Sequence, residues 1–205
     1  MPRKPRNVRS RTPDNARLEI AHAAARLIAE DGITDYGMAK RKAAYQLGLP
    51  EHYGLPNNDE VGEALRAYQA LYQDEDQPAQ LNELRHIALD VLRCLASFSP
   101  YLVGAVLDGT AGRFSAIEIE AFAESAKDVE LFLLNRNIDF QHARLPRTPG
   151  EGPEAVFELD WDDAPVRLTV YHSLAERART RLRTGKPAPR VRETALAAML
   201  AEQSE

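Results

Sequence analysis

The chain lacks several features that define large protein classes, beginning with cysteine. Its single cysteine, Cys94, excludes an internal disulfide and a zinc cluster built on cysteines. No apolar run approaches about 18 residues, the length that a membrane span needs, and the basic N-terminus is not followed by the apolar stretch of a secretory signal. The motifs of P-loop, serine-hydrolase and HExxH metalloprotease sites are also missing. We therefore expect a soluble, cytoplasmic protein of bacterial type without a membrane partner.

What is present is the composition of an ordinary globular protein. The chain has 205 residues, of which 44% are hydrophobic and 28% are charged. These values are close to the averages of about 45–50% and 25% for globular domains. A chain of this length can bury a core without disulfides, so a largely disordered or collagen-like protein is excluded.

Charge is unevenly distributed along the chain. Residues 1–17 carry a net charge of +5 and residues 166–192 a net charge of +7, whereas residues 18–165 carry −14. Basic ends can bind nucleic acid by releasing counterions from phosphates. Two alternatives to nucleic-acid binding stay open: a solvated, disordered tail for the N-terminal stretch, and pairing of the C-terminal arginines with the acidic middle of the same chain.

The expected elements are helical first and rich in strands later. Apolar spacing predicts helices at 17–30, 36–47, 58–72, 79–97, 125–137, 173–183 and 190–202. The alternation of apolar and polar residues predicts a hairpin at 156–161 and 166–172. Helices that precede the strands favour the α+β class over alternating βαβ units.

The segment 101–122 joins two patterns that are both typical of strands. The run YLVGAVL at 101–107 predicts a buried strand, and residues 115–123 alternate apolar and acidic side chains with the period of two that a strand requires. Glu118 and Glu120 therefore lie on one face of the second strand.

These residues resemble the signature of the nucleotidyltransferase fold, the DNA polymerase beta-like superfamily. That signature is an apolar strand, a Gly-Ser turn, a second glycine five residues on, and Asp-x-Asp on the next strand. Gly104 and Gly109 match the two glycines, and Glu118 stands at the second aspartate. The resemblance covers about residues 80–172 and implies a small mixed β-sheet of nucleotidyltransferase type with helices, preceded by a helical N-terminal region.

The resemblance also implies a chemistry. In the family, the glycine turn lets backbone amides approach a nucleoside triphosphate, and carboxylates on two strands hold two magnesium ions. It makes Glu118 and Glu120 the candidate catalytic and magnesium-binding acids, and Gly104, Gly109 and Arg113 the candidate nucleotide-binding residues. Arg113, in the loop between the two strands, can contact a phosphate bidentately. The plainer alternative is that these acids and Arg113 face solvent.

Two positions depart from the signature. Ala105 replaces the turn serine, and Ala116 replaces the first aspartate. The later strand, 166–172, offers no acid, and the nearest candidates are Glu158, Asp160 and Asp163. Transfer of a nucleoside monophosphate is therefore expected to be weak or lost.

The sequence leaves two hypotheses. The first is a nucleotidyltransferase-like protein with a degenerate metal site. The second is a non-catalytic adaptor, whose helical N-terminal half binds a protein partner or whose basic ends bind nucleic acid. In both, we divide the chain into a basic disordered tail (1–16), a helical region (17–78) and a nucleotidyltransferase-like α+β domain (79–205).

Overall fold

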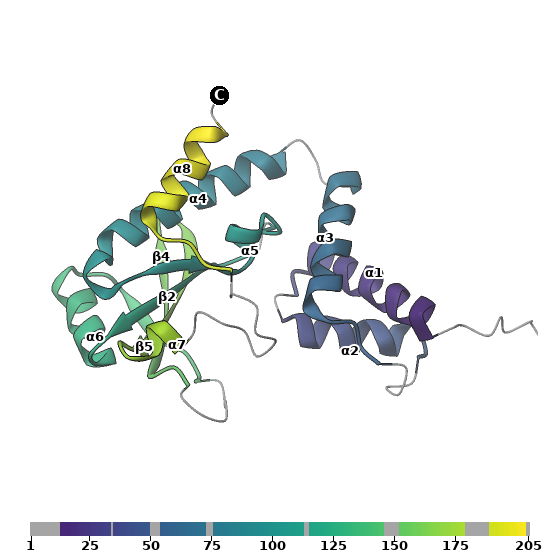
Figure 1. The fold of residues 1–205 in the computed structure, drawn as a ribbon, viewed down its shortest axis with the longest axis horizontal. Coiled ribbons are helices and arrows are strands. Elements are labelled where there is room, and N and C mark those ends of the chain that lie inside the picture. The colour runs from purple at the N-terminus through teal and green to yellow at the C-terminus, as the bar shows by residue number, and fades with distance from the viewer. Residues whose placement is uncertain are drawn as a thin grey trace, which may run out of the picture. The chain divides into compact units, whose positions relative to one another are not determined.

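The computed structural model describes residues 13–33, 35–49, 54–72, 76–112, 115–145, 152–178 and 189–203. The chain forms two compact units that divide between Asp74 and Glu75. The first unit is helical and the second combines helices with one sheet (Figure 1), so the predicted α+β class with a helical N-terminal region is confirmed. Within the described residues, no helix is both long and apolar enough to cross a membrane.

The N-terminal unit consists of α1 (Pro13–Asp31), α2 (Tyr36–Gln46) and α3 (Asn58–Tyr72). Small side chains let α1 and α2 approach closely, and the fully buried ones include Ala24, Ala25, Ala39 and Ala43. Residues 13–16, which we expected in the disordered tail, form the first turn of α1. The rest of that expected tail, 1–12, lies outside the described residues.

Local hydrogen bonds fix where α2 and α3 begin. The Asp35 side chain accepts a hydrogen bond of 2.7 Å from the Met38 amide at the start of α2. At the start of α3, the Glu60 amide donates to Asn57 Oδ1 (2.8 Å) and the Asn57 amide donates to Glu60 Oε2 (2.6 Å), which is a capping box. Arg17 of α1 donates twice to the same carboxylate, at 3.0 and 2.8 Å, and so ties α1 to α3.

The C-terminal unit is built around a five-stranded mixed sheet. Its strands are β1 (Tyr101–Val103), β2 (Ile117–Ala123), β3 (Phe140–His142), β4 (Ala155–Trp161) and β5 (Ala164–His172). The strand order is β1-β2-β5-β4-β3. Only the β2–β5 pair is parallel, and the other neighbours are antiparallel.

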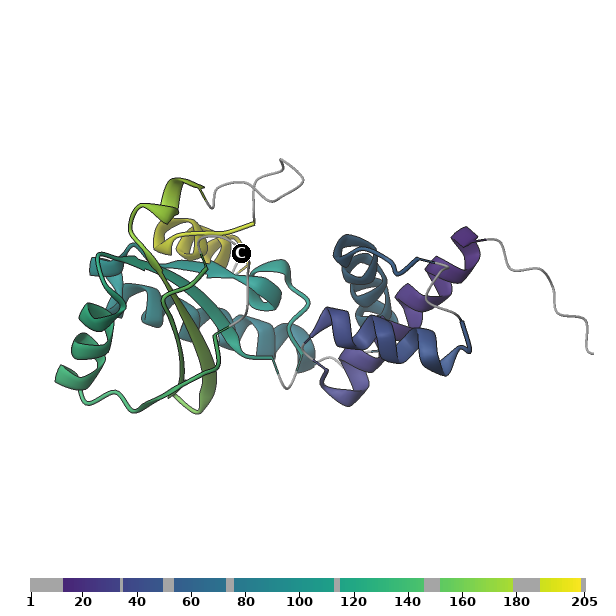
Figure 2. The same cartoon turned by 90° about the horizontal axis from the view of Figure 1, so that it is seen from below.

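Helices cover one face of this sheet. They are α4 (Asp76–Cys94), α5 (Gly104–Asp108), α6 (Ala126–Asn135) and α8 (Glu193–Glu202). A further short helix, α7 (Ala175–Ala178), follows β5 and is not part of this layer. A 3-10 turn, η2 (Ala96–Phe98), joins α4 to β1. Helices α4 and α8 lie side by side in Figures 1 and 2. Leu92, Val129 and Leu196 from the helices share one buried cluster with Ile117 and Ile119 of β2, so the even-numbered residues of β2 point to the opposite face.

Three elements differ from the predicted ones. The prediction of a strand through 107 is wrong, because the chain leaves the sheet at Gly104 and forms α5. The edge strand β3 was not predicted. Residue Val191 is extended rather than helical: it exchanges backbone hydrogen bonds of 2.9 and 3.1 Å with Leu102, and the helix begins only at Glu193. Residues 179–188, part of which was predicted as helix, lie outside the described residues.

Candidate functional site

The turn between β1 and α5 depends on glycine. Val103 is extended, and Gly104, where α5 starts, has φ of +71°. Helix α5 ends at Asp108, and the next residue, Gly109, has φ of +78°. Positive φ at these two positions favours glycine over any residue with a Cβ. The two glycines that the sequence singled out therefore bracket α5, one at each end.

Glu118 packs directly against this turn. It is the cross-strand partner of Val103, and a Cβ placed on Gly104 would lie 2.6 Å from Glu118 Oε2 and 2.8 Å from Glu118 Cδ. The residue as a whole is exposed, but its carboxylate end is crowded by the turn. Burial raises the pKa of the Glu118 carboxyl, Arg167 opposes that shift, and Asp108 and Glu120 add to it.

A row of charged side chains crosses the face of the sheet to which the even-numbered residues of β2 point, called the open face below. The parallel register places Glu118 of β2 opposite Arg167 of β5, and the next pair places Arg167 opposite Glu158 of β4. Arg167 Nη1 lies 3.5 Å from Glu158 Oε1. In the strand register, Arg167 therefore lies between two acidic residues on the neighbouring strands.

Glu120 occupies the neighbouring row on the same face. It is half-buried, and its cross-strand partners are Tyr101 of β1 and Thr169 of β5. The two acids of β2 thus share a face, as the alternating pattern predicted, but neither β1 nor β5 supplies a third acid beside them.

A buried arginine holds α5 from the other side. Arg85 of α4 is 5% exposed, and its Nε and Nη2 donate to the carbonyl oxygens of Val106 (3.1 Å) and Leu107 (3.3 Å). Burial lowers the pKa of Arg85. Arg85 acts as a positioning residue, because its hydrogen bonds fix the last carbonyls of α5 and hence the turn that precedes them. The sequence signal that indicates this role is the placement of a basic residue, Arg85, on the apolar face of the helix that includes Leu84 and Ala88.

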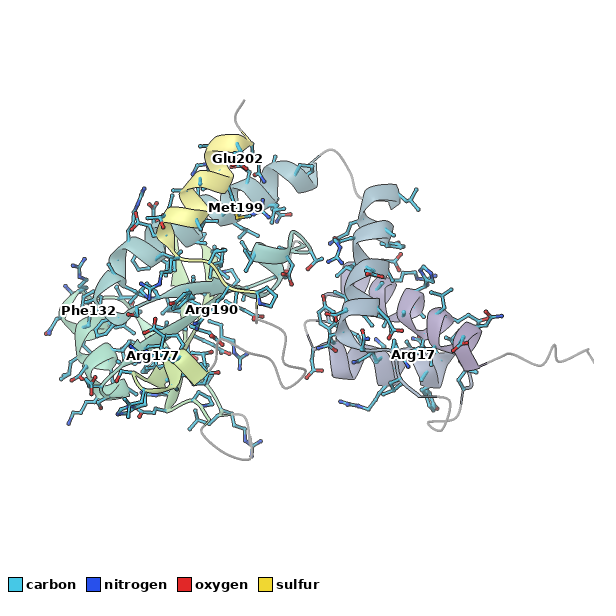
Figure 3. All side chains as sticks on the ribbon, viewed as in Figure 1. Arg17, Phe132, Arg177, Arg190, Met199 and Glu202 are labelled. Atoms are coloured by element: carbon cyan, nitrogen blue, oxygen red, sulfur yellow. The ribbon has the colours of Figure 1, made fainter. Side chains whose placement is uncertain are left out.

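A second polar cluster lies on the same face, around Tyr101, the cross-strand partner of Glu120. Tyr101 donates to Glu176 Oε1 (2.7 Å), and Arg192 Nη2 bonds the same oxygen at 2.6 Å. The guanidinium of Arg190, labelled in Figure 3, lies 4.1 Å from the centre of the Tyr101 ring. It also lies 5.7 Å from that of Phe122. These arginines of the basic C-terminal stretch therefore contact partners within their own unit.

The predicted site residues are only partly brought together. Gly104 and Glu118 are in contact, Gly109 lies at the other end of α5, and Glu120 lies in the next row. Arg113 lies outside the described residues. Arg85 and Arg167 were missed, and for Arg167 no local signal existed, because its position opposite Glu118 depends on the pairing of two strands distant in sequence.

The donor set does not fit a two-magnesium clamp. In such a clamp, carboxylates from neighbouring strands hold the two ions together. Carboxylates are suitable because magnesium prefers oxygen ligands in octahedral geometry. Here the strand beside Glu118 presents Arg167, and the acids of β4 lie beyond it. In the described part of the chain, no group of three or more His, Cys, Asp or Glu side chains could hold a metal ion.

Comparison with known proteins adds no family assignment: neither a protein-family model nor a curated protein matches the chain.

Proposed function

We propose that the C-terminal unit is a nucleotidyltransferase-like module in which transfer of a nucleoside monophosphate is weak or lost. The observation that carries this proposal is the position of Arg167 between Glu118 and Glu158, where a metal-dependent transferase requires another carboxylate. The glycine turn at Gly104, with an acid of the next strand packed against it, supports the resemblance to the fold.

The expected loss of transfer follows from charge. Metal ions supply several kcal/mol of transition-state stabilisation in phosphoryl chemistry, and metal ligands must be deprotonated. Burial raises the pKa of the Glu118 carboxyl, so deprotonating Glu118 to make it a metal ligand costs more than for an exposed carboxyl. Arg167 places a positive charge beside it, which opposes a second cation at the same place.

A transfer assay tests the proposal. Each of the four nucleoside triphosphates, labelled at the α-phosphate, is incubated with the full chain and Mg²⁺ or Mn²⁺. We expect little transfer, at the same level in the wild type, in Glu118→Gln and in Glu193→Gln. Glu193, a partly exposed acid of α8 that pairs with Arg93, is the matched control. Robust transfer that Glu118→Gln abolishes and Glu193→Gln preserves would contradict it.

Residual nucleotide binding at the turn is a separate part of the proposal. If phosphates approach Gly104 without a metal, the ionised carboxylate of Glu118 repels them. Glu118→Gln should then bind a fluorescent nucleoside triphosphate more tightly than the wild type, whereas a metal-mediated site predicts weaker binding. Gly104→Ala should lose the binding. Gly48→Ala should retain it, because Gly48 also has a positive φ but a Cβ added there would meet no atom within 4 Å.

A non-catalytic adaptor is the second candidate, and the N-terminal unit carries the observation that favours it. On α2, Met38 and Tyr45 are 49% and 87% exposed, with Arg41 exposed between them. An exposed aromatic and methionine face is typical of protein interaction surfaces. A partner that co-purifies with the wild type should be lost in Tyr45→Ser and kept in Leu71→Ser, which removes a similarly exposed side chain from α3. Equal retention in both variants rejects this surface.

A further inference from the structure

Arg167 has a position that the resemblance does not assign, and its charge deepens the proposed loss of transfer. It lies in the middle of a row that runs from Glu118 on β2 through Arg167 on β5 to Glu158 on β4. Side chains directly opposite on neighbouring strands point to one face with their Cβ atoms about 4.5–5.5 Å apart. Arg167 is therefore the cross-strand neighbour of both acids; its Nη1 lies 3.5 Å from Glu158 Oε1, and its charge opposes the burial that raises the pKa of the Glu118 carboxyl.

The pairing that creates this row is fixed by the core on the other side of the sheet. Ile117 and Ile119 of β2 face Val166 and Leu168 of β5 in the register, and all four are buried. A shift by one residue would turn these apolar side chains to the open face. The apolar residues thus hold Arg167 opposite Glu118, whatever ligand the open face binds.

We propose that Arg167 takes the place of a divalent cation in this row, so that the site carries its own positive charge and does not bind a metal ion. The inference concerns the same face as the proposed function, but it depends on charge and not on transfer. The disagreement between the donor set and the magnesium that the resemblance implies then has a physical cause besides the alanine at position 116, namely the basic side chain of Arg167 on β5.

If the charge of Arg167 keeps metal ions away, reversing that charge should allow the row to bind a divalent ion. Arg167→Glu would place three carboxylates in one row on adjacent strands, about 4.7–4.9 Å apart from strand to strand. Changing the side-chain charge by two units about 6 Å from a divalent ion, with screening by physiological salt, corresponds to about a tenfold change in affinity or more.

The test is a titration of the full chain with Mn²⁺ in the absence of nucleotide, in which electron paramagnetic resonance measures the free ion. We expect no saturable binding by the wild type up to millimolar Mn²⁺, at least a tenfold gain in affinity for Arg167→Glu, and a smaller gain for Arg167→Gln. The control is Arg136→Glu, the same charge reversal at an arginine that lies over the Phe132 ring, 4.8 Å from its centre; it should gain nothing.

The fluorescence of Trp161, the only tryptophan of the chain, shows whether each variant is folded. If Arg167→Glu unfolds, Arg167→Gln carries the test alone. Mn²⁺ binding by the wild type that is lost in Glu118→Gln overturns the inference, and so does a folded Arg167 variant whose affinity equals that of the wild type. Because no nucleotide is present, the titration measures metal binding separately from transfer, so failure of this inference can be distinguished from failure of the proposed function.

Discussion

Replacing Gly104 by alanine probes the contact on which the candidate site is built. The left-handed conformation of this residue, with φ of +71°, costs a residue with a Cβ about 1–2 kcal/mol. The new methyl group would also lie 2.6 Å from Glu118 Oε2, and moving the end of this flexible side chain aside costs about 1 kcal/mol, the low end of the cost of overpacking. We expect Gly104→Ala to lower the free energy of unfolding of the C-terminal unit by about 2–3 kcal/mol.

Urea denaturation followed by tryptophan fluorescence measures this quantity for the correct unit. Trp161, the single tryptophan, lies in β4 of the same sheet, so the transition reports the C-terminal unit alone. The matched control is Gly109→Ala. Gly109 has φ of +78°, but its nearest neighbours, in Arg85 and Leu81, would be 3.7 and 3.8 Å from the added Cβ. It should lose only the conformational part, about 1–2 kcal/mol.

A double-mutant cycle separates the two contributions. In a Glu118→Ala background the clashing carboxylate is absent and the closest remaining contact is that with the Cβ of residue 118, at 3.4 Å. Gly104→Ala should then cost no more than Gly109→Ala, which corresponds to a coupling of about 1 kcal/mol between positions 104 and 118. An identical cost of Gly104→Ala in both backgrounds would refute the packing of Glu118 against the turn.

Three further predictions concern local stability. Asp163, with φ of +62°, occupies the two-residue turn between β4 and β5, so Asp163→Gly should stabilise the C-terminal unit by about 0.5–1 kcal/mol in the same urea assay. Asn57→Ala should remove half of the capping box of α3 and cost about 1 kcal/mol, measured by far-ultraviolet circular dichroism during thermal unfolding; an unchanged midpoint for the N-terminal unit would contradict it. The raised pKa of Glu118 contributes stability that is fully present below its ordinary value of 4.5 and is lost as the pH rises through the folded-state pKa. Glu118→Gln should therefore be more stable than the wild type at pH 7, and the difference should vanish in unfolding experiments below about pH 4.

The sequence predicts most of the regular elements because their patterns are local. The alternation in 115–123 and in the hairpin strands repeats over enough residues to exclude a helix, and both were found as strands. The prediction of a strand over the whole of 101–107 was wrong because a short apolar stretch is equally compatible with a strand and with a buried helix. What decides between them is the positive φ of Gly104, and composition does not reveal that angle.

The candidate site likewise has one feature that the sequence predicts and one that depends on tertiary pairing. That Glu118 and Glu120 share a face follows from the period of a strand, and the structure agrees. The position of Arg167 beside Glu118 follows from the parallel pairing of β2 with β5, whose residues are far apart in the chain. No pattern within either strand specifies that partner, so the charge that most affects the site was beyond local prediction.

The turn at Gly104 is held by contacts that need no ligand. From β2, the Glu118 side chain packs on it; from α4, the buried Arg85 bonds the carbonyls of Val106 and Leu107. A buried hydrogen-bonded guanidinium is costly to leave unpaired, so selection for stability alone can retain this geometry. The proposed nucleotidyltransferase-like scaffold is therefore compatible with the proposed loss of its metal site, because the hydrogen bonds and packing that shape the turn are independent of the charges that a metal-dependent reaction would require.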